Sequence, residues 1–171
     1  SAHYAELTAL ELHQRSDRIA HGLVGVGIGP DVRTVLMVGP GLDFFAVTFA
    51  MLKVGAIPVM VDPGMGIKNL AECLREAEPE AFIGVPKAQA ARVIWGWGKQ
   101  TIKTNVTVGR RFFWGGHTLG KLQAQAPDDP FPILQPDPEQ TAAILFTSGS
   151  TGVPKGVITP FRVFTAQVKA L

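Results

Sequence analysis

The residues most suited to chemistry lie together in the stretch FTSGSTGVPKGV, from Phe146 to Val157. Its twelve residues include three glycines, four hydroxyl side chains and one lysine, Lys155. Glycine permits positive φ and lets the backbone approach a ligand closely. Successive backbone N–H groups can then form a nest for anionic oxygens, to which hydroxyls and a lysine add donors. This composition indicates a cradle for a polyphosphate, and a solvated turn rich in serine, threonine and glycine is the alternative.

Three better-known glycine motifs do not fit. A Walker A loop needs Gly-Lys followed by Ser or Thr at the start of a helix, whereas Lys155 lies between a proline and a glycine. The stretch GVGIGP at 25–30 lacks the spacing of a dinucleotide fingerprint and follows a helical pattern instead of a strand. Ser150 directly follows Gly149, so the G-x-S-x-G turn of a nucleophilic serine is absent.

Helical stripes of apolar residues and β-rich runs alternate along the first half of the chain. The expected helices cover 5–23, 42–54 and 67–78, a short fourth helix starts near 87, and the expected strands cover 32–38, 56–61 and 81–85. Such alternation is typical of βαβ units. We therefore predict an α/β fold with a mostly parallel sheet flanked by helices. The helical spacing assigns Phe45 and Phe49 to the core.

The second half is less regular until it reaches the glycine-rich stretch. Glycines interrupt 95–122, in which 105–109 is the expected strand, and prolines make 127–138 a loop. The run TAAILF, from Thr141 to Phe146, predicts a strand that leads directly into the candidate phosphate loop. A short strand at 156–159 and a helix from 161 are expected to follow. A loop that leaves a parallel strand lies at the carboxyl edge of its sheet, where open α/β folds bind ligands.

The composition is that of a globular chain. Of its 171 residues, 46% are hydrophobic and 18% are charged, and the net charge of +2 gives no electrostatic case for nucleic acid. The one cysteine, Cys73, excludes an internal disulfide, favours a cytoplasmic setting, and is expected to be buried and inert. No apolar run reaches the roughly 20 residues of a membrane-spanning helix, and the first residues lack a signal-peptide pattern.

Several other residues carry no assigned chemistry. Near four basic residues lies an aromatic cluster made of Trp95, Trp97, Phe112, Phe113 and Trp114. It could be a nucleic-acid or membrane face, but we favour packing against the sheet or a partner surface, because it lacks a helical stripe. The four histidines show no metal-ligand spacing. Asp62 and Pro63 are interpreted as a turn that ends a strand.

The segment from Thr147 to Gly156 resembles the phosphate-binding signature of the adenylate-forming superfamily, [ST]-[ST]-G-[ST]-T-G-x-P-K-G, at every fixed position. That superfamily includes acyl-CoA synthetases, acyl-AMP ligases, luciferases and the adenylation domains of peptide synthetases. Two further segments, LKVGAIPVMVDP at 52–63 and YAEL at 4–7, are similar to its L-K-A-G-A-x-x-V-P-L-D-P and Y-x-E-L segments. Within the superfamily, 62–70, 76–93 and 95–99 resemble the β-lactone synthetases of olefin biosynthesis.

The resemblance implies an ATP-dependent enzyme that converts a carboxylic acid into an acyl-AMP. It implies that Lys155 is catalytic, that Thr147 is a ligand of Mg²⁺, and that ATP is bound by Thr147, Ser148, Gly149, Ser150, Thr151, Gly152 and Lys155. The β-lactone branch further implies a long-chain 2-alkyl-3-hydroxy acid as substrate, a β-lactone as product, and assembly with other enzymes of olefin biosynthesis. A fatty acyl-CoA synthetase or an acyl-AMP ligase is the alternative.

The resemblance also implies that the chain is one part of a longer enzyme. Members often carry a histidine shortly after the loop, where this chain has Phe161. Their later motifs lie downstream of the position of Leu171, among them a glutamate for Mg²⁺, an aspartate for ribose and the lysine of a mobile C-terminal domain. We therefore expect 1–171 to be an incomplete N-terminal part of the AMP-binding large domain that is inactive alone. A nucleotide-binding scaffold is the non-enzymatic alternative.

Overall fold

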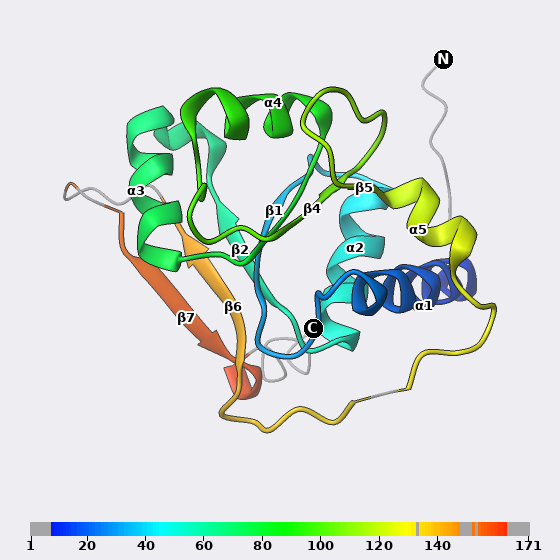
Figure 1. Ribbon diagram of the computed structural model, residues 1–171. Coiled ribbons are helices and arrows are strands. Elements are labelled where there is room, and N and C mark those ends of the chain that lie inside the picture. The colour runs from blue at the N-terminus through cyan, green and yellow to red at the C-terminus, as the bar shows by residue number, and fades with distance from the viewer. Residues whose placement is uncertain (1–7, 133, 148–151, 153, 164–171) are drawn as a thin grey trace, which may run out of the picture.

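A single seven-stranded sheet organises the described part of the protein. The computed structural model describes residues 8–132, 134–147, 152 and 154–163. The strands follow the order β5-β4-β3-β1-β2-β6-β7 (Figure 1). They are β1 (Arg33–Met37), β2 (Ile57–Val61), β3 (Ala81–Gly84), β4 (Thr104–Thr107), β5 (His117–Thr118), β6 (Thr141–Phe146) and β7 (Gly156–Pro160). All neighbouring pairs are parallel except β6 and β7, so the predicted mostly parallel sheet is confirmed.

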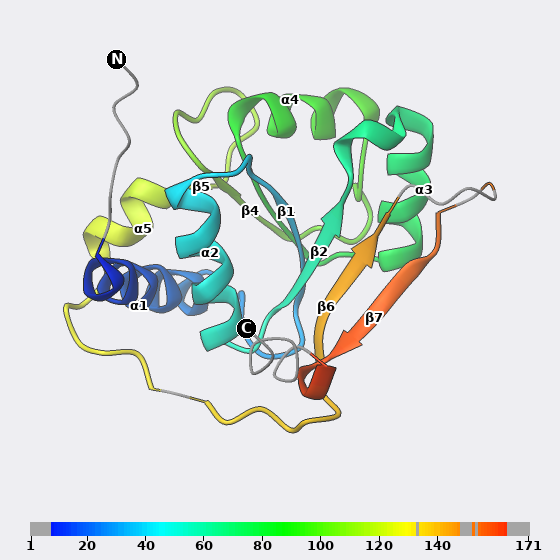
Figure 2. The ribbon, with the colours of Figure 1, turned by 180° about the vertical axis from the view of Figure 1, so that it is seen from behind.

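Helices cover both faces of this sheet. One face carries α1 (Ala9–Gly25), α2 (Leu42–Lys53) and α5 (Leu119–Gln125), and the other carries α3 (Ile67–Ala77) and α4 (Pro86–Trp95) (Figures 1 and 2). A 3-10 turn, η1 (Pro63–Met65), links β2 to α3. The result is the three-layer arrangement of α/β folds, in which each sheet face is buried by amphipathic helices. None of the described helices is long and apolar enough to cross a membrane.

Two apolar clusters fill the space between the sheet and the helices. Successive residues of a strand point to opposite faces, so Leu36 and Ile83 pack beneath α1 and α2, whereas Val35 and Phe82 pack beneath α3. Because β2 and β3 are covered on both sides, their sequences, IPVMV and AFIG, carry no polar side chain instead of alternating, whereas β1 begins with Arg33 and Thr34.

The connections reverse direction between β1 and β3. From β1 the chain crosses one face through α2 to β2, whereas from β3 it crosses the opposite face through α4 to β4. In open α/β sheets, such a reversal separates the connecting helices and leaves a crevice at the carboxyl ends of the two strands. This topology therefore favours a ligand crevice between β1 and β3.

The prediction that Phe45 and Phe49 are core residues is wrong. Their exposed fractions are 52% and 46%, because α2 buries its smaller residues instead, which are Ala46, Val47, Ala50 and Met51. Small side chains allow α2 to lie close to α1 and to the sheet. The helix is apolar on nearly every face, so spacing alone could not tell its packed side from its exposed side.

The sequence patterns also missed β5 and α5, which lie in the glycine-interrupted stretch. β5 has only two residues, and α5 only seven, which is too short for a periodic signal. The available signal was Thr118, whose hydroxyl caps α5 by accepting the Lys121 N–H. The predicted strands at 105–109 and 156–159 are confirmed as β4 and β7. Residues 5–7 and 164–171 of the predicted terminal helices lie outside the described residues, and 161–163 are helical.

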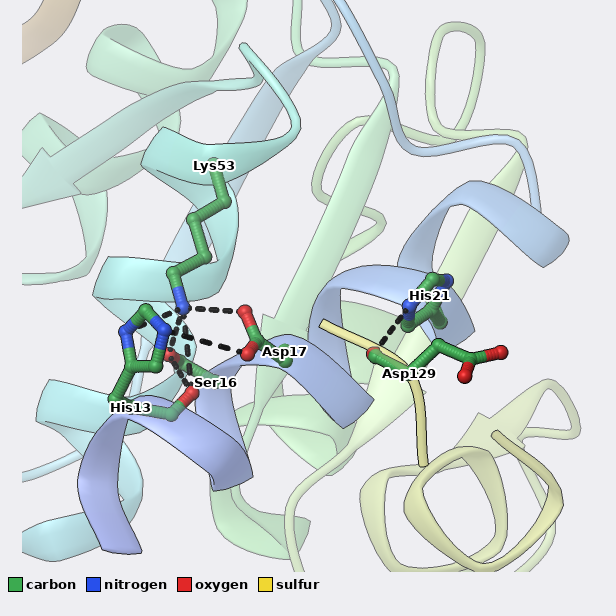
Figure 3. Close-up of polar contacts among 6 residues, drawn as sticks. All are labelled: His13, Ser16, Asp17, His21, Lys53 and Asp129. Carbon is green, nitrogen blue, oxygen red and sulfur yellow. Dashed lines mark hydrogen bonds and ion pairs between the residues drawn. The ribbon is translucent and has the colours of Figure 1, made fainter. Parts of the chain in front are cut away.

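A buried charge cluster fastens α2 to α1 (Figure 3). The Lys53 ammonium lies 2.6 Å from the Asp17 carboxylate and 2.7 Å from the Ser16 hydroxyl, and it also reaches the His13 carbonyl at 3.2 Å. Ser16 is only 1% exposed, and its hydroxyl donates to the His13 carbonyl, so it is a structural residue and not an accessible nucleophile. Lys53 belongs to the LKVGAIPVMVDP segment, which therefore carries a structural lysine.

Replacing Lys53 with methionine should lower the free energy of unfolding by about 3–5 kcal/mol, because the buried Asp17 carboxylate loses its cation. Urea unfolding measures the change. The control is Arg75→Met, which breaks an exposed surface ion pair with Glu72 and should cost about 0–1 kcal/mol. Equal small losses in both variants would show that the buried cluster does not stabilise the fold.

Candidate functional site at the carboxyl edge

The candidate phosphate loop starts at the carboxyl end of β6. Val61 of β2 lies beside Phe146, and the Asp62 backbone N–H donates to the Phe146 carbonyl over 3.2 Å. Thr147 follows directly and is exposed. The predicted strand and the predicted start of the loop at its carboxyl end are therefore confirmed. Four other predicted site residues lie outside the described part of the chain, namely Ser148, Gly149, Ser150 and Thr151.

The returning limb of the loop brings a cation to the same edge. Gly152 has φ +103°, a left-handed conformation that glycine adopts at little cost. Pro154 is buried and anchors the limb, whereas the next residue, Lys155, is exposed. Within the described residues, Lys155 has neither a hydrogen-bond partner nor an ion-pair partner. Its ammonium is therefore available to an anionic ligand at the carboxyl edge.

Close packing explains the glycine after Lys155. Gly156 pairs with Phe146 across the antiparallel strands, and a Cβ at Gly156 would lie 2.9 Å from Cζ of the Phe146 ring. The Gly156 N–H also donates to the Glu76 carboxylate on α3 over 3.3 Å. These two contacts fix the base of the loop against the sheet and α3. Glu76 could not be identified from the sequence, since no motif signals a carboxylate so distant along the chain.

A cavity of about 680 Å³ opens at the same edge, over the reversal point between β1 and β3. The ends of β1 and β2 line it, together with Val85, which directly follows β3, and with residues of η1, α3 and α4. Its lining includes Met37, Val38, Val61, Val85, Ala88 and Trp97. Its size falls in the range of about 300–1,000 Å³ that is typical of small-molecule sites. The candidate site thus joins a polar loop to an apolar cavity.

Two titratable residues near this edge, Asp62 and Cys73, have structural roles. Asp62 caps η1 by accepting the Gly64 N–H over 2.8 Å, which confirms the predicted strand-ending turn. Cys73 is buried as predicted, and burial raises the pKa of its thiol to about 11, with a smaller contribution from the charge of Glu76. A thiol that stays protonated at neutral pH is a poor nucleophile. The described residues contain no group of three or more His, Cys, Asp or Glu suited to a metal ion.

The aromatic cluster divides between packing and exposure. Trp97 is buried in the apolar cluster beneath α3 and stacks on Trp95 at a ring separation of 5.6 Å. The indole N–H of Trp114 donates to the Thr107 hydroxyl on β4 over 2.9 Å. The predicted packing against the sheet is therefore confirmed for these two residues, whereas Phe112 and Phe113 are exposed.

Phe161, which the resemblance aligns with the family's histidine, lies at the opposite end of the β6–β7 hairpin from the loop. Pro160 pairs with Thr141 at the start of β6, and the Phe161 N–H donates to the Gln140 carbonyl over 3.0 Å. The departure from the family pattern at Phe161 therefore falls at the amino end of β6, away from Thr147 and Lys155.

The chain is similar to known proteins along its whole length. The family model described as "AMP-binding enzyme" matches residues 2–171. The olefin beta-lactone synthetase of Stenotrophomonas maltophilia (strain K279a) is 50% identical over the whole chain, and that of Xanthomonas campestris pv. campestris is 46% identical. In both cases the chain spans 31% of the relative's length.

A solved structure has the same fold. The anthranilate CoA ligase AuaEII, determined in complex with anthranoyl-AMP, superposes with a TM-score of 0.86 at 17% identity. The superposition covers 96% of this chain and 32% of the ligase. At this identity the likeness establishes the fold alone, in agreement with the sheet topology described above.

Replacing Gly156 with alanine should destabilise the base of the loop by about 1–3 kcal/mol, because the added methyl group collides with the Phe146 ring. Thermal or urea unfolding measures the loss. Gly120→Ala is the matched control, since a Cβ there meets no atom within 4 Å and the residue lies in a helix, where alanine is favourable. A destabilisation confined to Gly120→Ala, or equal in both variants, would contradict the packing argument.

Proposed function

The chain belongs to the AMP-binding enzyme family, and we propose that it is the N-terminal part of an enzyme that activates a carboxylic acid with ATP. The observation that carries the proposal is the candidate phosphate loop, which leaves β6 at the carboxyl edge and returns with an exposed, unpaired Lys155 among the described residues. The chain spans 31% of the length of each of the two curated relatives. This share supports the proposal that 1–171 form an incomplete part of the large domain.

In this proposal, the loop holds the phosphates of ATP. Backbone N–H groups of 148–152 hydrogen-bond the β- and γ-phosphate oxygens, and the Lys155 ammonium neutralises their charge. The hydroxyls of Ser150 and Thr151 donate to the same oxygens. The positive φ of Gly152 and the exposure of Lys155 support these roles on the returning limb of the loop.

The first step is transfer of the adenylyl group. A carboxylate oxygen attacks the α-phosphorus and forms a P–O bond, and the bond from that phosphorus to the bridging oxygen of the β-phosphate breaks. Pyrophosphate leaves with the bonding electron pair, and the products are acyl-AMP and pyrophosphate. The protein accelerates this step mainly by positioning the reactants and by stabilising the charge that develops on the leaving phosphates. We propose Lys155 as the catalytic residue because its ammonium would contact that leaving group.

Thr147 fits a role as one ligand of Mg²⁺. Its hydroxyl is an oxygen donor of the kind that this hard cation accepts, and it is exposed at the end of β6 next to the loop. Mg²⁺ usually keeps few protein ligands and takes the remainder from phosphate oxygens and water, which agrees with the lack of an acidic cluster among the described residues. When bound, the ion would neutralise charge on the polyphosphate.

We further propose that the acyl-AMP closes to a β-lactone. The substrate is a long-chain 2-alkyl-3-hydroxy acid, whose hydroxyl oxygen attacks the activated carbonyl carbon. A C–O bond forms, the bond from the carbonyl carbon to AMP breaks, and the hydroxyl proton passes to solvent or a base. This assignment is supported by the 50% and 46% identity to two olefin beta-lactone synthetases. A cytoplasmic location and association with other enzymes of olefin biosynthesis complete the proposal.

Incubating the full-length protein with ATP, Mg²⁺ and a 2-alkyl-3-hydroxy acid in the absence of coenzyme A tests this function. We expect β-lactone, AMP and pyrophosphate in equal amounts, because the attacking hydroxyl is part of the substrate. Mass spectrometry of the organic product and a pyrophosphate assay measure them. A stalled acyl-AMP, or a thioester formed only when coenzyme A is added, would contradict lactone formation while leaving the adenylation step intact.

The 171-residue chain should not catalyse ATP–pyrophosphate exchange by itself. It carries the loop, but the family resemblance assigns the groups that hold the ribose and complete the Mg²⁺ site to the remainder of the enzyme. Radiolabelled exchange, compared with the full-length protein at equal concentration, measures this directly. Exchange by the chain alone would overturn the proposed division of the large domain.

A further inference from the structure

The apolar cavity at the carboxyl edge has no assigned ligand. It lies over the reversal point between β1 and β3, where the fold itself leaves a crevice. Apart from Lys87 at its border, its lining carries no charged side chain. The rim residue Ile67 remains 48% exposed, so apolar surface faces water at the mouth of the cavity. Filling such a site with hydrocarbon is favourable at about 25 cal/mol per Å² of apolar surface removed from water.

The cavity borders the strand that pairs with the start of the candidate phosphate loop. Val61 lines the cavity and lies beside Phe146, the last residue of β6 before Thr147. The end of β2 therefore lies between the start of the loop and the part of the cavity over β1 and β3. The far wall is formed by α4 and Trp97.

Small residues on α4 create much of this space. Ala88 and Ala91 are three positions apart, so they lie on the same side of the helix, and both line the cavity. Both also border the apolar cluster beneath α3. Ala90, on the same helix, does not line the cavity and provides a matched position for comparison.

We propose that this cavity binds one of the two alkyl chains of the substrate, an inference that rests on the function proposed above. A 2-alkyl-3-hydroxy acid carries one chain at C2 and another beyond C3, so two hydrocarbon arms diverge from the reacting carboxyl group. One site therefore needs two apolar channels beside the polar loop. The cavity supplies one channel: the carboxyl group lies toward Thr147, and the arm runs over β1 and β3 to end against Ala88, Ala91 and Trp97.

Replacing Ala88 with leucine in the full-length protein fills the far end of the cavity and tests the proposal. Two substrate series are compared, each lengthening one arm while the other arm stays constant. For one series, kcat/KM for the longest members should fall by about 10-fold or more while the shortest members are unaffected. Ala90→Leu should leave both profiles unchanged. Ala91→Leu repeats the test one turn along the same side of α4 if Ala88→Leu does not fold.

The outcomes separate this inference from the proposed function. Adenylation by the wild type with chain-length profiles that Ala88→Leu and Ala91→Leu leave unchanged would overturn the cavity assignment alone. Failure of the wild type to release pyrophosphate with every 3-hydroxy acid would overturn both proposals.

Binding provides a second readout that does not depend on turnover. Because Trp95 stacks on Trp97, the measurement uses the full-length protein carrying Trp95→Phe. A 3-hydroxy acid with bromine at the end of the assigned arm should quench the fluorescence of Trp97 in this variant, and the quenching should disappear when Trp97→Phe is added and weaken when Ala88→Leu is added. Equal quenching with and without Trp97→Phe would show that the arm ends elsewhere.

Discussion

The parallel pairing of β2 with β6 is the constraint on which the site depends. The chain leaves β5 at one edge of the sheet and must return across the fold to reach β2. Its connection lies against α1, where Arg18 pairs with Asp128 and the His21 ring contacts the Asp129 carbonyl over 3.0 Å (Figure 3). This long return brings the last residue of β6 next to the end of β2, and with it the candidate phosphate loop next to the apolar cavity.

The carboxyl edge therefore has two chemically different ends. At the β6 end lie a positive-φ glycine, Gly152, and an exposed cation, Lys155. At the β1 and β3 end lies a cavity walled almost entirely by hydrocarbon. A substrate with an anionic head and long apolar arms matches this arrangement, which is why the proposed acyl adenylate and its alkyl chain follow from one geometry. Three contacts hold these elements in place. Gly156 packs on Phe146, the Glu76 carboxylate accepts the Gly156 N–H at the end of the loop, and Lys53 pairs α2 with α1.

The parts of the fold that could be predicted from sequence are those with local signals. Strands buried on both faces, such as β3, are continuous apolar runs, and the phosphate loop has an unusual density of glycine and hydroxyl residues. What could not be predicted depends on packing between distant segments. Phe45 and Phe49 have the spacing of core residues, yet their helix buries its smaller side. The Glu76 contact and the cavity over β1 and β3 arise only once the sheet order is known.

ATP–pyrophosphate exchange by the full-length protein carrying Lys155→Ala tests whether the candidate loop holds the phosphates of ATP. We predict a fall of about 10²–10³-fold in the exchange rate, because the ammonium is proposed to stabilise the departing pyrophosphate. Lys121→Ala, which removes an exposed lysine on α5 at the opposite side of the fold, should keep the wild-type rate. Equal exchange rates and equal ATP affinities for the two variants would contradict the claim that the loop holds the phosphates of ATP.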